Sequence, residues 1–188
     1  MRRLRLQMQV SVDGFVATGP DDDQRWVTWA WDEIRDDVMA IVSACDTILL
    51  GRSLAEGYLP YWASALEDPG NPMADLARHI GEARKVVFSR TLTASPWPDA
   101  TIARGDTATE IAELKRRPGK DLVVYGGSSF VSSLIALGAI DEFHLFVNPV
   151  ALGRGAPIFA GIADAQRLDL VRTVPYPSGI VLLTYRPR

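Results

Sequence analysis

The chain has 188 residues, of which 47% are hydrophobic, 23% charged and 9% aromatic. This composition is typical of one ordinary globular domain and excludes disordered, collagen-like and coiled-coil chains. Twenty Lys and Arg residues against 23 Asp and Glu residues give a net charge of −3, which argues against a nucleic-acid partner.

No membrane, export or metal signal is expected from this sequence. The longest apolar run, at residues 147–152, is broken by Asn148 and Pro149 and is far shorter than the ~20 residues that span a bilayer. The start of the chain lacks the apolar core of a signal peptide. We therefore expect a cytoplasmic protein. A single cysteine, Cys45, with two distant histidines, His79 and His144, predicts neither a disulfide nor a metal site.

The first half of the chain predicts strands and helices in alternation. Residues 4–10 alternate apolar and polar side chains, which indicates a half-buried strand. A turn-rich stretch from Gly19 to Gln24 follows, and then an amphipathic helix from Trp31 to Cys45. Residues 47–50 form a continuous apolar run, typical of a strand covered on both faces. Residues 58–72 contain three prolines and are predicted to be mostly irregular.

The second half continues the alternation and ends in a hairpin. Helices are predicted over residues 73–82 and 130–137. A capping box formed by Thr107 and Glu110 predicts the start of another helix between these two helices. Strands are predicted at residues 85–88, 101–103, 122–125 and 143–147, and a hairpin at 168–174 and 180–185. The sequence therefore predicts one α/β domain over residues 1–188, with three layers. These are a mainly parallel central sheet, helices on both of its faces and a C-terminal antiparallel hairpin.

Three predicted strands end in groups that bind anions. One runs directly into Gly126, Gly127, Ser128 and Ser129 before a helix, where backbone N–H groups can meet a dinucleotide pyrophosphate. The same pattern also suits a tight turn with Ser128 as the helix N-cap, so the motif alone leaves both interpretations open.

The two other strand ends deliver arginines. Gly51 is followed by Arg52, and Ser89 by Arg90 and Thr91. A guanidinium fork beside hydroxyl groups suits a phosphomonoester, which is how a protein favours NADP over NAD. Each arginine alone is equally compatible with a surface ion pair, but three such ends in one sheet favour an extended anionic ligand.

Taken in order, these motifs resemble the dihydrofolate reductase-like superfamily. The similarity is greatest to the branch that contains the reductase domain of the bifunctional riboflavin-biosynthesis deaminase-reductase, and it covers essentially the whole chain. The matching segments are Ser11, Asp13 and Gly14 after the first strand, Gly51 with Arg52, Ser89 to Thr91, Tyr125 to Ser128, and residues 148–159.

The resemblance implies a binding site for NADPH. It places Gly51 and Arg52 at the cofactor phosphates, Ser89 and Arg90 at the adenosine 2′-phosphate, and residues 126–128 at the pyrophosphate. It also implies that residues 149–159 line the cleft and that the C-terminal hairpin joins a homodimer.

The substrate side is less clearly marked. The resemblance places Asp13 and Gly14 beside the nicotinamide and the substrate, with Asp13 as the candidate catalytic acid, whereas residue type alone favours an ordinary Asp-Gly turn. Dihydrofolate reductases carry an acid on the first helix, but Asp32 and Asp36 point away from the apolar stripe of the predicted helix here.

Two tryptophans near the first helix are further candidates. Trp26 and Trp29 either stack on a flat heteroaromatic substrate or anchor their loop on the core.

Three functions follow as hypotheses. The first is an NADPH-dependent reductase that transfers hydride to a small pterin-like, pyrimidine-like, ribityl or carbonyl substrate, with a loop over residues 16–29 that excludes water. The second is a non-catalytic protein that binds NADPH or another ligand, and the third is a flavin-dependent enzyme.

Overall fold

The computed structural model describes residues 1–19 and 22–188. Positions 20 and 21, part of the loop predicted over residues 16–29, lie outside the described residues. The chain divides into two compact units, each made of two separate pieces of sequence. The first unit holds residues 1–3 and 36–127, and the second holds residues 4–35 and 128–188. Helix α1 (Trp31–Ser43) gives its first five residues to the second unit and the rest to the first.

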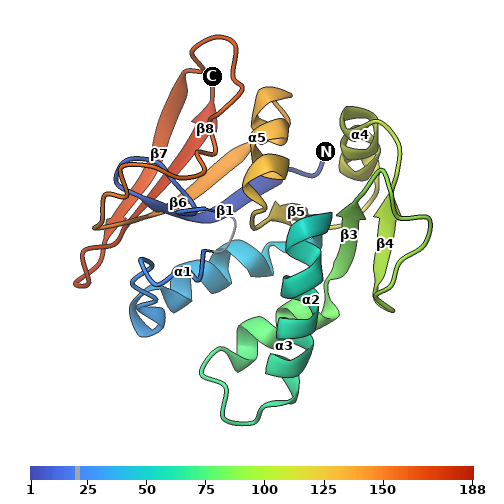
Figure 1. Cartoon of the computed structure of the whole chain (residues 1–188), viewed down its shortest axis with the longest axis horizontal. Helices are drawn as coiled ribbons and strands as arrows, with labels where there is room; N and C mark the ends of the chain where they lie inside the picture. The colour runs from blue at the N-terminus through green and yellow to red at the C-terminus, as the bar shows by residue number, and fades with distance from the viewer. Residues whose placement is uncertain (20–21) are drawn as a thin grey trace. The chain divides into compact units, whose positions relative to one another are not determined.

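The first unit is built on parallel strands in the order β4-β3-β2-β5. Figure 1 shows β3 and β4 side by side. Its elements after α1 are β2 (Cys45–Gly51), α2 (Arg52–Glu67), α3 (Ala74–Glu82), β3 (Arg84–Phe88), β4 (Ala100–Ala103), α4 (Thr107–Arg116) and β5 (Asp121–Val124). The central strands are fully buried: residues 48–50 and 122–124 have no exposed surface. This confirms the prediction that continuous apolar runs mark strands covered on both faces.

The second unit has strand order β1-β6-β8-β7. Its elements besides the start of α1 are β1 (Leu4–Ser11), α5 (Ser128–Ala136), β6 (Glu142–Asn148), β7 (Leu168–Pro175) and β8 (Val181–Pro187). Strands β1 and β6 are parallel, while β8 pairs antiparallel with both β6 and β7. The mainly parallel α/β class and the C-terminal hairpin are therefore confirmed. The assignment of a single domain stays a prediction.

One predicted irregular segment is in fact helical. Helix α2 continues to Glu67 with Pro60 in its interior, although proline normally ends or kinks a helix because it lacks an N–H donor. The buried Ala55 and the half-buried Tyr58 and Trp62 give α2 an apolar face. Packing of that face outweighs the local cost of proline, and no single-sequence pattern reports such packing.

The predicted capping box is shifted by one residue. The N-cap of α4 is Asp106, whose carboxylate accepts the backbone N–H of Thr109 at 3.0 Å. Thr107 is the first helical residue, and Glu110 reaches back to the N–H of Gly105 at 3.0 Å.

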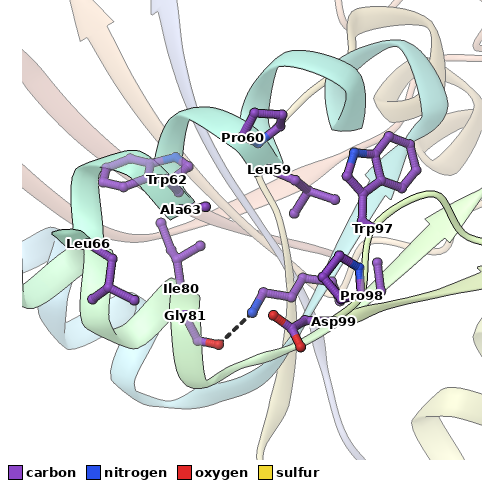
Figure 2. Close-up of a pocket in the computed structure, with 12 residues that line it drawn as sticks. Leu59, Pro60, Trp62, Ala63, Leu66, Ile80, Gly81, Trp97, Pro98 and Asp99 are labelled. Atoms are coloured by element: carbon purple, nitrogen blue, oxygen red, sulfur yellow. Dashed lines mark hydrogen bonds between the residues drawn. The ribbon is translucent and has the colours of Figure 1, made fainter.

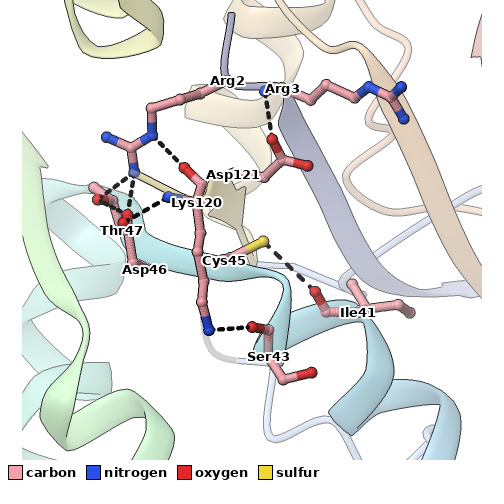
Figure 3. A network of polar contacts seen from close by, with 9 residues as sticks. All are labelled: Arg2, Arg3, Ile41, Ser43, Cys45, Asp46, Thr47, Lys120 and Asp121. Atoms are coloured by element: carbon pink, nitrogen blue, oxygen red, sulfur yellow. Dashed lines mark hydrogen bonds and ion pairs between the residues drawn. The ribbon is translucent and has the colours of Figure 1, made fainter. Parts of the chain in front are cut away.

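A polar network fastens the N-terminus to the first unit (Figure 3). The Arg2 guanidinium is buried and donates to the carboxylate of Asp46, the carbonyl of Lys120 and, at 2.8 Å, the hydroxyl of Thr47. The backbone N–H of Arg3 donates to Asp121 at 2.8 Å. These contacts hold the residue that leads into β1 against the starts of β2 and β5.

Candidate functional site

The three predicted anion-binding segments leave the same edge of one parallel sheet. Gly51 at the end of β2 is in register with Phe88 at the end of β3, and Leu49 of β2 is in register with Val124 at the end of β5. The residues that follow these strands therefore start side by side. Ligands of open α/β sheets bind beyond the carboxyl ends of their strands.

A hydrogen bond joins two of these segments. Arg52 begins α2 directly after β2, and its Nη1 donates to the hydroxyl of Thr91 at 2.7 Å. Its Nε donates to Glu56 at 2.9 Å, an i,i+4 pair on the same helix. Arg52 is thus held in place by one hydroxyl and one carboxylate, and it lies exposed beside the end of β3.

The turn after β3 carries a guanidinium that no described residue engages. The Ser89 hydroxyl is buried and accepts the backbone N–H of Leu92 at 3.1 Å and of Thr91 at 3.3 Å, which shapes the turn. Arg90 is exposed, and it makes no hydrogen bond or ion pair with any residue that the structure describes. An anion near this turn would meet a fork of free N–H donors.

The third segment is a glycine turn. Gly126 and Gly127 have φ angles of 155° and 77°, and the second value lies in the left-handed region that side chains disfavour. Ser128 then begins α5, which runs to Ala136, so the helix N-terminus follows the glycines directly. Ser128 is half-buried and Ser129 is exposed.

Asp13 belongs to the second unit, where its carboxylate is fully engaged. It accepts the Ser11 hydroxyl at 2.6 Å and the backbone N–H groups of Gly153 at 2.6 Å and Leu152 at 3.1 Å. These hydrogen bonds, that of Ser11 first, lower the pKa of Asp13 to about 2. At neutral pH the group is a carboxylate that carries no proton to donate.

Asp13 belongs to a set of contacts between residues 13–17 and residues 152–156 of the second unit, which we call the clasp. The Val16 N–H donates to the carbonyl of Ala156 at 3.0 Å, and the Ala156 N–H donates to that of Ala17 at 2.9 Å. Gly155 lies so close to Ala17 that a Cβ there would sit 2.0 Å from the Ala17 carbonyl oxygen. Gly14, with a φ of 84°, turns the chain at the start of this clasp.

The tryptophan loop is pinned at its base and exposed at its tip. Val27 is buried, and the Thr28 N–H donates to the side-chain oxygen of the fully buried Asn148 at 2.9 Å. Trp29 lies next to this anchor with a φ of 49° and 54% of its surface exposed. The Trp26 indole N–H donates to Asp22 at 2.9 Å.

The structure places the predicted cofactor residues from Gly51 to Gly127 at one edge of the first unit. Ser128 and Ser129 belong to the second unit, at the start of α5. The predicted substrate residues Asp13, Gly14, Trp26 and Trp29 belong to the second unit as well. The roles of all these residues stay predictions.

Sequence reasoning missed two contacts. In the second unit it did not predict that Asn148 anchors the tryptophan loop. In the first unit it missed Tyr58, whose ring stacks on that of Tyr125 with the ring centroids 5.7 Å apart. Tyr125 stands in the recognised Tyr-Gly-Gly motif, but Tyr58 lies in the segment that was predicted to be irregular.

The sheet order, the glycine turn and the C-terminal hairpin define a dihydrofolate reductase-like α/β fold. A dihydrofolate reductase from Enterococcus faecalis, solved in complex with NADP(H), superposes with a TM-score of 0.62 at 16% identity, covering 99% of this chain and 96% of that one. A putative riboflavin biosynthesis protein from Shewanella sp. PV-4 gives a TM-score of 0.74 at 18% identity, covering 100% and 99% of the two chains.

The chain belongs to the RibD C-terminal domain family, whose model matches residues 2–182. The Bacillus subtilis (strain 168) protein YyaP, itself uncharacterized, is 33% identical over 184 residues, which are 98% of this chain and 94% of that protein. The fold and family are therefore of the reductase type.

No helix among the described residues is long and apolar enough to cross a membrane.

Proposed function

We propose that this protein is an NADPH-dependent reductase. Its substrate would be a small pterin-like or pyrimidine-like heterocycle, or a ribityl or carbonyl compound, reduced at a C=N or C=O carbon. The observation that carries the proposal is the set of three adjacent strand ends, joined by the Arg52–Thr91 hydrogen bond, that present guanidinium, hydroxyl and glycine N–H groups at one edge.

Each segment has a distinct part in holding the nucleotide. Arg90 and Ser89 would hold the 2′-phosphate, because the Arg90 guanidinium is exposed and unengaged by the described residues. Gly126 and Gly127 would offer N–H donors to the pyrophosphate. Ser128 and Ser129 follow them in the chain and stay predicted cofactor residues. Arg52, positioned by Thr91, would add a second cation beside Gly51.

NADPH, when bound, would supply the hydride, and the chain would supply position and shielding. Asp13 would act on the substrate side by fixing the loop at residues 152–153. Because the pKa of Asp13 is low, the proton that completes the reduction would come from water. Gly14, Trp26 and Trp29 would border the substrate, with the exposed Trp29 ring available for stacking.

The test is a fluorescence titration with NADPH and NADH. The wild type is expected to prefer NADPH, and Arg90→Ala is expected to weaken NADPH by about tenfold or more while leaving NADH unchanged, because a charge-assisted hydrogen bond is lost. Arg78→Ala, which removes an exposed arginine on α3, is the matched control. Failure of both nucleotides to saturate, or a preference for NADH, would overturn the proposal.

A second candidate is a protein that binds the nucleotide without turnover. This candidate is favoured because none of the acids considered as proton donors is placed for that role. Asp32 and Asp36 on α1 are exposed, and the Asp13 carboxylate accepts hydrogen bonds from three donors. Loss of NADPH absorbance with a panel of pterins, pyrimidines and simple carbonyls decides between the two. Light scattering of the purified protein tests the expected homodimer.

A further inference from the structure

A cavity of about 300 Å³ lies in the first unit, away from the strand ends described above (Figure 2). Its walls come from the C-terminal half of α2, the end of α3 and the segment that leads into β4. They are largely apolar and include Leu59, Trp62, Leu66, Ile80 and Trp97. This volume is at the lower end of the range of small-molecule sites.

One cation is buried in this apolar wall. Lys85 on β3 is only 5% exposed, and its Nζ donates to the carbonyl of Gly81 at 2.6 Å. It forms no ion pair with any residue that the structure describes. One acceptor serves an ammonium with three N–H donors.

A buried ammonium that forms no ion pair is costly, and lysine is almost never fully buried unless it is paired. Burial lowers the pKa of Lys85, and the nearby carboxylate of Asp99 raises it in part. Asp99 is exposed at the rim of the cavity. The cavity therefore combines an apolar wall with one ammonium group that makes fewer hydrogen bonds to the described residues than it has N–H donors.

We propose that this cavity binds a small organic acid with an apolar, preferably aromatic, body. The carboxylate would pair with the Lys85 ammonium, and the apolar body would lie between Trp62 and Trp97 and against Leu59 and Ile80. A lone ammonium in an apolar wall suits a carboxylate better than a phosphate, because a phosphate demands more donors than one ammonium offers.

This site is separate from the proposed nucleotide site. Lys85 is near the start of β3, whereas Ser89 follows the end of that strand. Four strand residues place them ~13 Å apart along the chain. Binding of the acid and binding of NADPH are therefore expected to be measurable independently, so the failure of either proposal leaves the other standing.

Substitution of Asp99 is expected to change the binding of the acid in the opposite direction to substitution of Lys85. If an added carboxylate pairs with Lys85, the Asp99 carboxylate competes with it and repels it. Lys85→Met is thus expected to abolish the preference for an acid, and Asp99→Asn to strengthen it.

The experiment is calorimetric titration with 3-phenylpropionate and with its neutral amide, which has nearly the same shape. The wild type is expected to bind the acid about tenfold more tightly than the amide, because the bond to the ammonium is charge-assisted. Lys85→Met should bind the two compounds equally, and Asp99→Asn should bind the acid several-fold more tightly than the wild type does. Arg78→Met, which removes an exposed cation from α3, is the control and should keep the wild-type preference.

Equal binding of acid and amide by the wild type, an unchanged preference in Lys85→Met, or no binding of either compound would overturn the proposal. Thermal unfolding of each variant checks that it is folded. If Lys85→Met does not fold, Asp99→Asn decides, since its exposed side chain can be exchanged without opening the core: unchanged or weaker binding of the acid would then refute the proposal.

Discussion

Two stacked tyrosines in the first unit carry hydroxyl groups that no described residue pairs with. The rings of Tyr58 on α2 and Tyr125 after β5 lie 5.7 Å apart at an interplanar angle of 26°. Both hydroxyl oxygens are buried and have no hydrogen-bond partner among the described residues. Burial raises the pKa of both groups, so they stay protonated and neutral across the physiological range.

Removing either hydroxyl is expected to stabilise the protein. A buried, unmade hydrogen bond costs ~1–3 kcal/mol, and Phe keeps the ring and its stacking. Tyr58→Phe and Tyr125→Phe should therefore each raise the free energy of unfolding by about 1 kcal/mol. In a chain of 188 residues that is a rise in Tm of ~2–4 °C.

Urea unfolding and calorimetry measure this change, with Tyr61→Phe as the control. Tyr61 lies on the same helix but is 57% exposed, so its hydroxyl already meets water and the variant should be neutral. A loss of 1 kcal/mol or more in Tyr58→Phe or Tyr125→Phe would refute the reasoning, because it would show that the hydroxyl has a partner in the folded state.

Three further perturbations test other parts of the structure. Arg2→Met should lower the free energy of unfolding by ~2–3 kcal/mol in urea, since a buried guanidinium loses hydrogen bonds to a carboxylate, a hydroxyl and a carbonyl. Gly155→Ala should cost clearly more than Gly153→Ala in thermal unfolding, because only the former places a Cβ against backbone, at the Ala17 carbonyl; equal losses would contradict the close approach. For Glu142, burial raises the pKa but neighbouring cations lower it more. The ionised Glu142 therefore stabilises the fold fully above pH 4.5, its ordinary pKa, and this stabilisation is lost as the pH falls through the lower pKa of the folded state. In Glu142→Gln, the free energy of unfolding should depend less on pH below 4.5 than it does in the wild type.

The strand ends could be predicted from sequence because their signals are local. A run such as residues 48–50 is apolar at every position, which is typical of a strand that is covered on both faces. Once several such strands are taken as parallel, their carboxyl ends must share an edge, and the groups after Gly51, Phe88 and Val124 must start together. No distance information was needed for that inference.

Helix α2 shows where local signals fail. Pro60 argues against a helix on propensity alone, and the apolar contacts that outweigh it come from residues distant in sequence. The same error hid Tyr58 and the wall of the Lys85 cavity, because both depend on which face α2 turns toward the sheet. The partners of Lys85 were equally out of reach, since a lysine in a strand is usually read as an exposed side chain.

Asp13 illustrates the difference between the position of a residue and its chemistry. The sequence motif places an acid after the first strand, and the structure puts its carboxylate in contact with two backbone N–H groups of the loop that follows β6. Each of those bonds favours the ionised form, so the contacts that fix the loop also lower the pKa of Asp13, and the carboxylate holds no proton to donate at neutral pH. Asp13 therefore orders the loop at residues 152–153, and under the proposed reductase activity the proton for the substrate would come from another donor.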